Sequence, residues 1–398
     1  MNAALVEQRV RDLPYFDIDS YEPDADLLVL NLGPQHPSTH GVLRVKLYLD
    51  GELIVKAVPY PGYLHRGVEK LCEELTYVRI PAIVDKNDYV CPITNEQAAV
   101  MAFEKLLGVE VPRRARFVRT LLAELQRIAS HLLWLGTFAL DLGGALGGGS
   151  TVFLYCFRER ELILDLFEEL SGARFHYNTH TIGGNRHDLP AGFAAHVHTA
   201  MRVIASRIPE YEALTTAHRI FLDRTRGIGV LPRALALELG VTGPNLRASG
   251  VDHDLRRDVP YHAYDELEVR VASAKEGDCL ARARVRMTEL DESIRLVEQL
   301  VDGIPDGPLC SQKPTKFPNQ VKLNSGHAYV AVESARGELG TYVIAGGKNS
   351  GASPYRLKIR APSFHALSAL PYLLPGHTLS DAVAILGSLD PIMGEVDR

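Results

Sequence analysis

The sequence predicts an α+β fold, and three stretches of its 398 residues carry that prediction. Apolar and polar residues alternate on both sides of Asp50-Gly51, which is a strong hairpin signal. Residues 112–142 repeat apolar side chains at steps of three and four, the spacing of one helix face. Residues 322–360 alternate again around glycine turns, which indicates a second group of strands. Long helices are therefore expected between two regions of strands.

Length and composition narrow the class of protein. A chain of 398 residues exceeds a typical single core, so we expect an N-terminal arm and β-rich part at 1–60, a helical bundle at 61–303 and a C-terminal α/β part at 304–398. A formal net charge of −6 argues against a general nucleic-acid binder. Five scattered cysteines without a CxxC fit the reducing cytoplasm. No window approaches the ~18 apolar residues of a membrane span, so we expect a soluble chain that reaches a membrane through partners.

The most distinctive segment is NLGPQHPSTHG, residues 31–41. His36 and His40 lie in a loop that Pro34 and Pro37 restrict in shape. A histidine pair on a rigid loop can bind a metal, hydrogen-bond a ligand or shuttle protons. The alternative is two hydrogen-bonded structural histidines.

The following segment contains two candidate site residues. Arg66 lies near the start of a predicted helix, where it either polarises a buried cofactor or forms an exposed ion pair of little energetic value. Thr94 and Gln97 have the spacing of a capping box, which predicts a helix at 95–108. Tyr89 then lies in the loop before that helix, either packed at the rim of the core or offering its hydroxyl to a ligand.

The helix predicted at 112–142 carries a second, unusual stripe of charged and aromatic side chains. Such a face suggests contact with a polar cavity or another buried polar element; exposure to solvent and a subunit interface are the alternatives. Asp141 ends the helix and is well placed to partner a histidine from elsewhere. The stripe consists of Glu124, Arg127, His131, Trp134, Phe138 and Asp141.

Glycines and histidines follow this helix. Five glycines within 143–149 indicate a flexible or tightly turned loop, and no nucleotide-binding glycine pattern exists there or at 346–351. His176, His180 and His187 are spaced by four and seven, but no cysteine supports them, so we do not expect a three-histidine metal site. Further helices are expected at about 157–171, 192–223, 233–239 and 276–301.

Several of these segments together resemble one family. GPQHPSTHG followed by VLR, HRGVEK, NDYV-x(4)-NEQA, GVTGPNLRASG and the ending GEVDR are similar to the D-type subunit of respiratory complex I, the NADH–quinone oxidoreductase. The matched segments run from residue 31 to residue 398. The D-type subunit resembles the large subunit of nickel–iron hydrogenases, which implies a bundle of long helices with smaller β-containing pieces.

The hydrogenase resemblance does not extend to a metal site. Hydrogenases hold their metals with two CxxC pairs, which would fall near HRGVEKLC and near DPIMGEVDR. Only Cys72 lies near the first position, and the second has no cysteine. Since Ile, Met and Val cannot replace thiolate ligands, we expect no nickel site and no metal bound by this chain.

The resemblance to the complex I family implies roles for five residues. Tyr89 and His40 would hydrogen-bond the two carbonyl oxygens of a quinone, with Asp141 holding His40, and these three form the expected catalytic set. Arg66 and His176 would lie near the iron–sulfur cluster of the adjoining B-type subunit. The sequence departs from the family pattern in a Gly-rich stretch longer by about one and a half helical turns, and in Thr181-Ile182 where the family has Arg-Pro.

The expected function is therefore the quinone-binding component of a proton-translocating NADH–quinone oxidoreductase. Quinone is the substrate, while NAD and the iron–sulfur clusters belong to partner subunits, which include those of types B, C, H and I. The chain would be peripheral, on the cytoplasmic side of the cell membrane. The alternative is an assembly or structural paralogue without quinone chemistry. The sequence leaves ubiquinone and menaquinone, and the electron donor of the complex, open.

Overall fold

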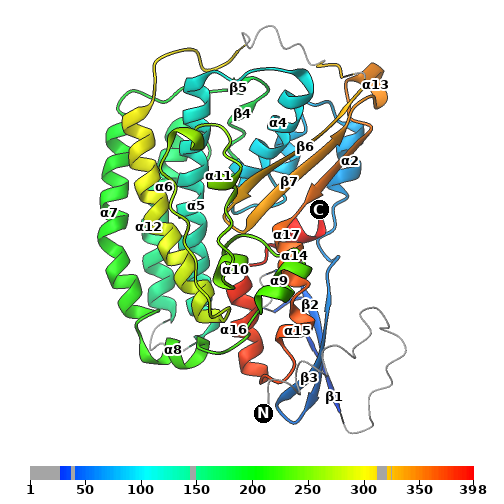
Figure 1. Ribbon diagram of the computed structural model, residues 1–398, viewed down its shortest axis with the longest axis vertical. Coiled ribbons are helices and arrows are strands. Elements are labelled where there is room, and N and C mark those ends of the chain that lie inside the picture. The colour runs from blue at the N-terminus through cyan, green and yellow to red at the C-terminus, as the bar shows by residue number, and fades with distance from the viewer. Residues whose placement is uncertain (1–26, 37–40, 144–148, 312–320, 324) are drawn as a thin grey trace.

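A computed structural model of the chain describes residues 27–36, 41–143, 149–311, 321–323 and 325–398. It confirms the predicted α+β fold, since long helices lie beside two separate three-stranded antiparallel sheets (Figure 1). The expected N-terminal arm, residues 1–26, lies outside the described residues. Within the described ranges, no helix is long and apolar enough to cross a membrane.

The N-terminal sheet confirms the predicted hairpin. Its strands are β1 (Leu28–Leu32), β2 (Arg44–Asp50) and β3 (Leu53–Tyr60), in the order β1-β2-β3. Asp50 pairs with Leu53, so the two-residue turn consists of Gly51 and Glu52, and Gly51 takes the left-handed conformation that such turns need. Alternate residues of β2 are buried in the main core, which fixes the register of the sheet.

Four long helices form the bundle, and they lie side by side in Figure 1. Helix α5 (Arg113–Asp141) matches the predicted 112–142 to within one residue at each end. The start predicted for the next helix was wrong, because α6 (Gly149–Ser171) begins eight residues earlier than 157, inside the Gly-rich stretch. The helix predicted at 192–223 is broken into α7 (Phe193–Leu214) and α8 (Arg219–Thr225). The fourth long helix is α12 (Cys279–Gly303).

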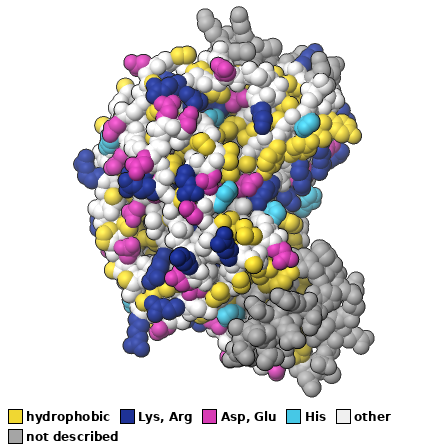
Figure 2. Space-filling model, viewed as in Figure 1, with side chains coloured by type: hydrophobic (Ala, Val, Ile, Leu, Met, Phe, Trp, Pro, Cys, Tyr) yellow, Lys and Arg dark blue, Asp and Glu magenta, His cyan; other side chains and the backbone are white. Residues whose placement is uncertain are grey.

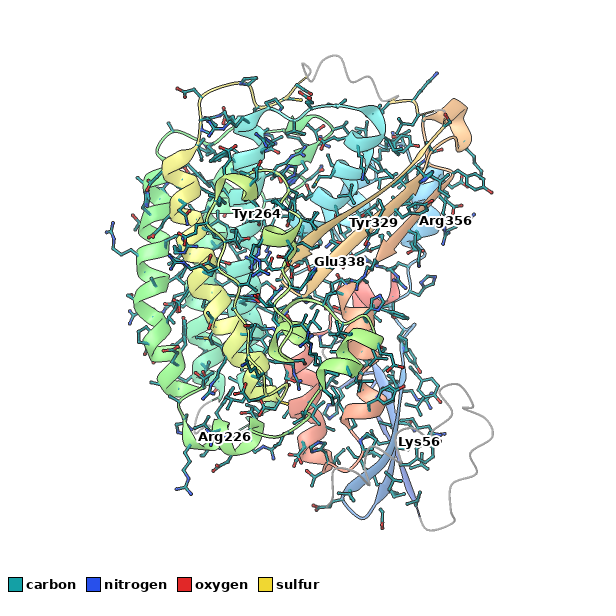
Figure 3. The ribbon with its side chains drawn as sticks, in the orientation of Figure 1. Lys56, Arg226, Tyr264, Tyr329, Glu338 and Arg356 are labelled. Carbon is teal, nitrogen blue, oxygen red and sulfur yellow. The ribbon has the colours of Figure 1, made fainter. Side chains whose placement is uncertain are left out.

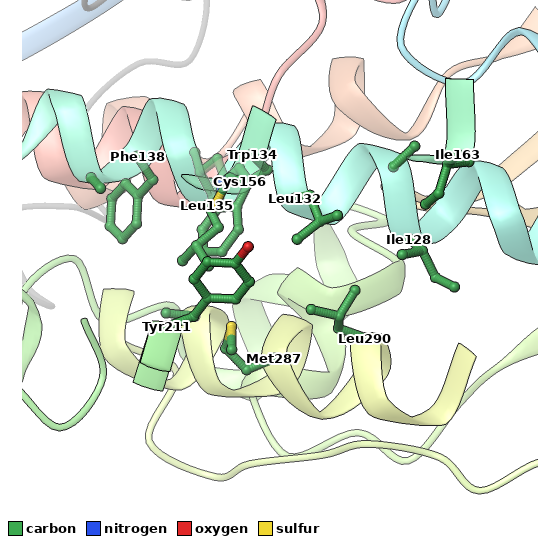
Figure 4. Packing of buried hydrophobic residues seen from close by; sticks show 14 of the residues in the cluster. Ile128, Leu132, Trp134, Leu135, Phe138, Cys156, Ile163, Tyr211, Met287 and Leu290 are labelled. Atoms are coloured by element: carbon green, nitrogen blue, oxygen red, sulfur yellow. The ribbon is translucent and has the colours of Figure 1, made fainter. Parts of the chain in front are cut away.

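The apolar face of α5 forms the centre of the main core (Figure 4). Ile128, Leu132 and Leu135 are fully or almost fully buried on this face. They face α6, α7 and α12, which contribute Cys156, Tyr211 and Leu290 among others. Burying a side chain of this size stabilises the fold by about 1.5–3 kcal/mol, so the stripe read from the sequence accounts for the position of α5.

Helix α4 (Pro92–Leu107) corrects the predicted capping box. The helix begins at Pro92 rather than at Asn95, because proline suits the first helical position. Thr94 lies inside the first turn and donates its hydroxyl to the Cys91 carbonyl oxygen, at 3.0 Å, instead of capping an amide. The predicted end is confirmed, since Gly108 follows the helix in the left-handed conformation.

The C-terminal sheet and its helices complete the fold. The strands β6 (His327–Ser334), β7 (Gly337–Ile344) and β8 (Arg356–Arg360) form a sheet in that order, packed against α4 and α2 (Val68–Glu74). Helix α16 (Leu379–Leu389) packs along α5 and α12, and α17 (Met393–Asp397) follows it. The shorter elements are α3 (Pro81–Val84), β4 (His180–Thr181), β5 (Gly184–Asn185), α9 (Arg233–Glu238), α10 (Gly243–Ala248), α11 (Leu255–Asp258), η3 (Tyr264–Glu266), α13 (Lys348–Gly351), α14 (Pro362–Leu367) and α15 (Leu370–Leu373).

Candidate functional site

Helix α17 is the place where two of the predicted site segments meet. A β-carbon at Gly41 would lie 3.3 Å from Met393 Cγ, so the end of the histidine loop packs directly on this helix. A β-carbon at the next helix residue, Gly394, would lie 2.6 Å from the Asn87 carbonyl oxygen and 3.5 Å from Tyr89 Cδ1. Only glycine allows so close an approach, and it places Tyr89 and the end of the loop against consecutive residues of one helix.

The histidine loop itself is described only at its ends. His36 and Gly41 form an isolated antiparallel bridge, which closes the loop at its base. His40, the predicted quinone ligand, lies outside the described residues. Its chain neighbour Gly41 nevertheless fixes the base of the loop at Met393.

Tyr89 lies in the loop before α4, as predicted, and its side chain is partly buried. The adjacent Val90 carbonyl oxygen accepts a hydrogen bond of 2.8 Å from Gln126 Nε2, which ties the loop to the middle of α5. Burial and the neighbouring Asp88 carboxylate raise the pKa of Tyr89, so the phenol stays protonated at neutral pH. Its hydroxyl forms no hydrogen bond within the described part of the chain and remains available to a ligand.

Asp141 lies far from Tyr89. It is the last residue of α5, roughly 22 Å along the helix axis from Gln126, at a rise of about 1.5 Å per residue. The structure therefore does not bring the Asp141 carboxylate into contact with the Tyr89 hydroxyl.

Arg66 and His176 do lie together, around the turn at Asp85 and Lys86. Arg66 donates a 2.6 Å hydrogen bond to the Lys86 carbonyl oxygen, and His176 Nδ1 lies 3.4 Å from Asp85 Oδ2. Burial lowers the pKa of His176, and the Asp85 carboxylate partly opposes this effect. Asp85 precedes Tyr89 by four residues, so both lie on the short segment around the end of α3 and the start of α4, at most about 14 Å apart along the chain.

The second stripe of α5 faces a buried polar network inside the chain, which was one of the predicted alternatives. The Glu124 carboxylate accepts hydrogen bonds from Tyr264, at 2.5 Å, and from Ser293, at 2.7 Å. Arg127 and Arg256 lie 3.3 Å from the same carboxylate, and both guanidinium groups are buried. Figure 3 labels Tyr264, which lies between the bundle and the C-terminal sheet. The stripe is buried from Glu124 to Phe138, which excludes exposure of this part to solvent, while Asp141 at its end is half-buried.

Charge pairing stabilises the ionised side chains of this network. Burial alone would raise the pKa of Glu124, but Arg127 and Arg256 hold it below its ordinary value. Further along the stripe, His131 Nε2 lies 3.0 Å from Glu289, which also pairs with Arg247 at 2.8 Å. Removing one partner of such a buried pair typically costs about 3–5 kcal/mol, because the other charge is left uncompensated.

Sequence reasoning missed a second buried cluster, next to Tyr89. Arg336, in the turn between β6 and β7, pairs with Asp88 at 2.7 Å and with Asp390 at 3.3 Å. Glu395 of α17 is also fully buried there. These residues come from positions up to about 300 apart in the sequence, so no local pattern links them. The only available signal was two acidic residues in the otherwise apolar stretch at 390–396.

The two segments that hold the cysteine pairs of hydrogenases lie side by side here. The Asp397 carboxylate accepts hydrogen bonds from the backbone amides of Gly62 and Leu64, at 2.8 and 2.7 Å. Cys72 is fully buried, and burial raises its pKa to about 12, so it stays a thiol rather than a metal-binding thiolate. Among the described residues, no group of three or more His, Cys, Asp or Glu side chains is arranged to hold a metal ion.

The family assignment follows from comparison with known proteins. Residues 147–398 match the family model described as the 49 Kd subunit of respiratory-chain NADH dehydrogenase. The second D-type NADH-quinone oxidoreductase subunit of Rhizobium etli is 46% identical over 393 residues, covering 93% of this chain and 95% of the relative. The chain belongs to this family. The D-type NADH-quinone oxidoreductase subunit of Methylacidiphilum infernorum is 44% identical over 397 residues, covering 94% and 93% of the two chains.

A solved structure of the same family shares the fold. A chain of the membrane-bound sulfane sulfur reductase, an archaeal respiratory membrane complex, superposes with a TM-score of 0.89 at 37% identity. The match covers 95% of this chain and 100% of that chain. The family assignment confirms the resemblance read from the sequence. The chain is a component of a multi-subunit respiratory oxidoreductase complex of the NADH–quinone oxidoreductase type.

Proposed function

We propose that this chain forms the quinone-reducing site of its complex together with the cluster-bearing B-type subunit. The observation that carries the proposal is the shared contact on α17, where Gly41 and Tyr89 pack against Met393 and Gly394. It brings Gly41, at the end of the histidine loop, and Tyr89, whose hydroxyl is available, against the same helix. A quinone headgroup has one carbonyl oxygen on each side, which suits a hydrogen bond from Tyr89 on one side and from His40 on the other.

Asp141 has a separate role in this proposal. It lies too far from Tyr89 to share a hydrogen bond, so it acts on the headgroup through His40. A carboxylate beside an imidazole stabilises the protonated form and raises its pKa. When His40 gives its proton to the reduced quinone, the charge of the His40–Asp141 pair changes. We propose this change as the local event that is linked to proton pumping in the membrane arm.

Electrons reach the site from the side of Arg66 and His176. These side chains lie around one turn that adjoins Tyr89, and both offer cationic or hydrogen-bond donor groups to a neighbouring subunit. A nearby positive charge favours the reduced, more negative form of an iron–sulfur cluster. The cluster itself belongs to the B-type partner, and NADH is oxidised elsewhere in the complex.

The adjoining surface supports contact with partner subunits. Figure 2 shows Lys and Arg side chains gathered beside hydrophobic ones along the edge formed by the C-terminal sheet and α2. Tyr355 is 67% exposed there, and Tyr63 is 51% exposed. Arg356, labelled in Figure 3, pairs with Glu69 and Glu73 on α2. Exposed aromatic side chains beside charged groups are typical of interfaces, and through them the chain would be held at the cytoplasmic side of the cell membrane.

The decisive experiment is quinone reduction in membranes, with assembly of the complex checked separately. Tyr89→Phe removes one hydroxyl and keeps the ring, so the fold should survive. Loss of a hydrogen bond worth about 1–3 kcal/mol predicts a five- to hundredfold loss in rate or affinity. Wild-type turnover in an assembled Tyr89→Phe complex would show that Tyr89 does not hold the headgroup and would contradict the proposal. Absence of quinone reduction in the assembled complex with the unchanged chain would favour the structural paralogue, which the Gly-rich stretch near 143–150 motivates.

A double variant tests the role of Asp141. His40→Gln keeps a hydrogen-bonding side chain but cannot titrate, and Asp141→Asn removes the countercharge. If Asp141 acts through His40, the double variant should be no slower than the slower single variant. Fully additive losses would show that Asp141 acts by another route. Metal analysis of the purified complex tests the hydrogenase alternative. Nickel in stoichiometric amount would contradict the inference that a chain without the two cysteine pairs binds no nickel.

A further inference from the structure

The buried cluster behind Tyr89 contains one more acidic group than its cations balance. Arg336 lies between Asp88 and Asp390, and Arg286 of α12 also lies near Asp390, donating to the Ser388 carbonyl oxygen at 3.1 Å. Two guanidinium groups therefore face two carboxylates. The third acid, Glu395, accepts one hydrogen bond of 3.1 Å from the Ser363 amide and has no cation of its own.

Hydrogen bonding in the cluster is also incomplete. Glu395 Oε1 and Asp390 Oδ2 are buried and have no hydrogen-bond partner among the described residues. The same holds for both side-chain amide atoms of Asn87, whose carbonyl oxygen packs against Gly394. A buried polar atom without a partner is costly, and a buried unpaired charge more so. A neutral carboxylic acid at Glu395 reduces both costs, because it carries no charge and supplies a donor.

The groups that face Glu395 are Asp88 from the loop before α4, Arg336 from the β6–β7 turn, which also pairs with Asp390, and Ser363 from α14. Asp88 favours the neutral form of Glu395, whereas Arg336 and the hydrogen bonding of Ser363 favour the charged form, and burial outweighs them. Burial, followed by repulsion from Asp88, raises the pKa of Glu395 to about 8. At neutral pH the side chain therefore holds a proton in the interior of the protein.

This proton is stored next to the proposed quinone ligand. Glu395 directly follows Gly394, where a β-carbon would lie 3.5 Å from Tyr89 Cδ1. Asp88 directly precedes Tyr89, and Asp88, Arg336 and Asp390 all act on the pKa of the Tyr89 phenol. A change of charge on Tyr89 therefore acts on Asp88 and Arg336, and these two groups in turn act on the pKa of Glu395.

We propose that Glu395 is a proton store for the quinone site and returns a proton to Tyr89 through this cluster. The proposal rests on the proposed function, in which two electrons arrive from the iron–sulfur cluster of the partner subunit. The Tyr89 O–H bond breaks as its proton passes to a reduced quinone oxygen, leaving a phenolate. The Glu395 O–H bond then breaks and its proton restores the phenol, leaving a carboxylate. Glu395 is recharged with a proton from solvent before the next turnover.

Infrared spectroscopy of the purified complex tests the stored proton without relying on turnover. The carbonyl stretch of a protonated carboxylic acid should be present at pH 7, should disappear as pH rises through the Glu395 pKa of about 8, and should be missing in Glu395→Gln. Glu395→Asp should retain a titrating band, and Tyr89→Phe, as a matched control, should retain the wild-type band. A wild-type minus Glu395→Gln spectrum without this band at pH 7 would overturn the proposal, whatever the activity of the complex.

Kinetics then test the transfer. Glu395→Gln mimics the neutral acid but cannot release a proton, so kcat for quinone reduction should fall roughly a hundredfold with KM unchanged. Glu395→Asp should recover part of kcat, and the alkaline fall in wild-type kcat near the Glu395 pKa should be absent in the Gln variant. Wild-type kcat in an assembled Gln variant would refute proton supply by Glu395. Wild-type kcat in Tyr89→Phe would instead refute the proposed quinone site and with it the transfer step, leaving the infrared result to decide whether Glu395 holds a proton.

Discussion

Replacing Glu395 by Gln should make the folded chain more stable at neutral pH, which is unusual for a change at a fully buried position. In the folded chain the pKa of Glu395 is about 8, against an ordinary value of 4.5. Below pH 4.5 the acid is protonated in both states and behaves like the amide. As pH rises, the unfolded chain releases the proton first, so the folded state is penalised by about 1.4 kcal/mol per pH unit until about pH 8.

The size of the effect follows from these two values. The Gln variant should match the wild type near pH 4, exceed its free energy of unfolding by about 3 kcal/mol at pH 7, and by about 5 kcal/mol above pH 8. Urea unfolding of the purified chain at acid, neutral and mildly alkaline pH measures this difference. A difference that stays constant with pH, or grows toward acid pH, would refute the reasoning.

Glu124 provides a control of opposite sign. Its folded-state pKa is lowered, so its charged form stabilises the fold above the ordinary pKa of the carboxyl group, and this stabilisation is lost as pH falls. Glu124→Gln should therefore destabilise the chain most at neutral and alkaline pH. The two buried glutamates should thus change the free energy of unfolding in opposite directions as pH rises.

Four further outcomes are expected. Arg66→Met and His176→Met should leave quinone binding intact but shift the reduction potential of the partner's iron–sulfur cluster. Potentiometric titration at several pH values measures this shift. Unchanged potentials would show that both residues have only a structural role. Gly394→Ala should displace Tyr89 and lower the rate of quinone reduction at least ~tenfold, because the new β-carbon would lie 2.6 Å from the Asn87 carbonyl oxygen. A normal rate would show that the packing around Gly394 does not position Tyr89. Arg336→Met should cost about 3–5 kcal/mol in urea unfolding, since two buried carboxylates lose their cation. Expressed without partners, the chain should self-associate through its exposed apolar surface, and a monodisperse monomer in light scattering would argue against that interface.

Local sequence signals were sufficient where one periodic face determines an element. The limits of α5 were predicted to within one residue, because its apolar stripe runs unbroken from Phe117 to Leu135, over most of the helix. Prediction failed where two local signals competed. Pro92 outweighed the Thr94 capping pattern at the start of α4, and close packing against the Ala139 backbone draws Gly149 into α6 although glycine is a poor helix former.

The candidate site was predictable only in part, for a physical reason. The position of Tyr89 before a helix is a local property and was read correctly. The partners that tune it are not local, since Asp88 and Arg336 lie 248 residues apart in the sequence. A buried charge cluster depends on which elements pack together in three dimensions, and the composition of the chain does not predict this. The same limit applies to Asp141, whose distance of roughly 22 Å along α5 from the Gln126 contact with the Tyr89 loop depends on where that loop docks.

The short turn from Asp85 to Tyr89 connects the two ends of the candidate site, so protonation of His176 and ligand binding at Tyr89 are related by linkage. His176 adjoins Asp85 at one end, and under the proposed function a quinone adjoins Tyr89 at the other. Any ligand that shifts the pKa of His176 must itself bind with an affinity that changes with pH across the titration of His176, by the same coupling free energy. Under the proposed function, a quinone whose binding shifts the pKa of His176 would report on the protonation of a histidine that it does not touch.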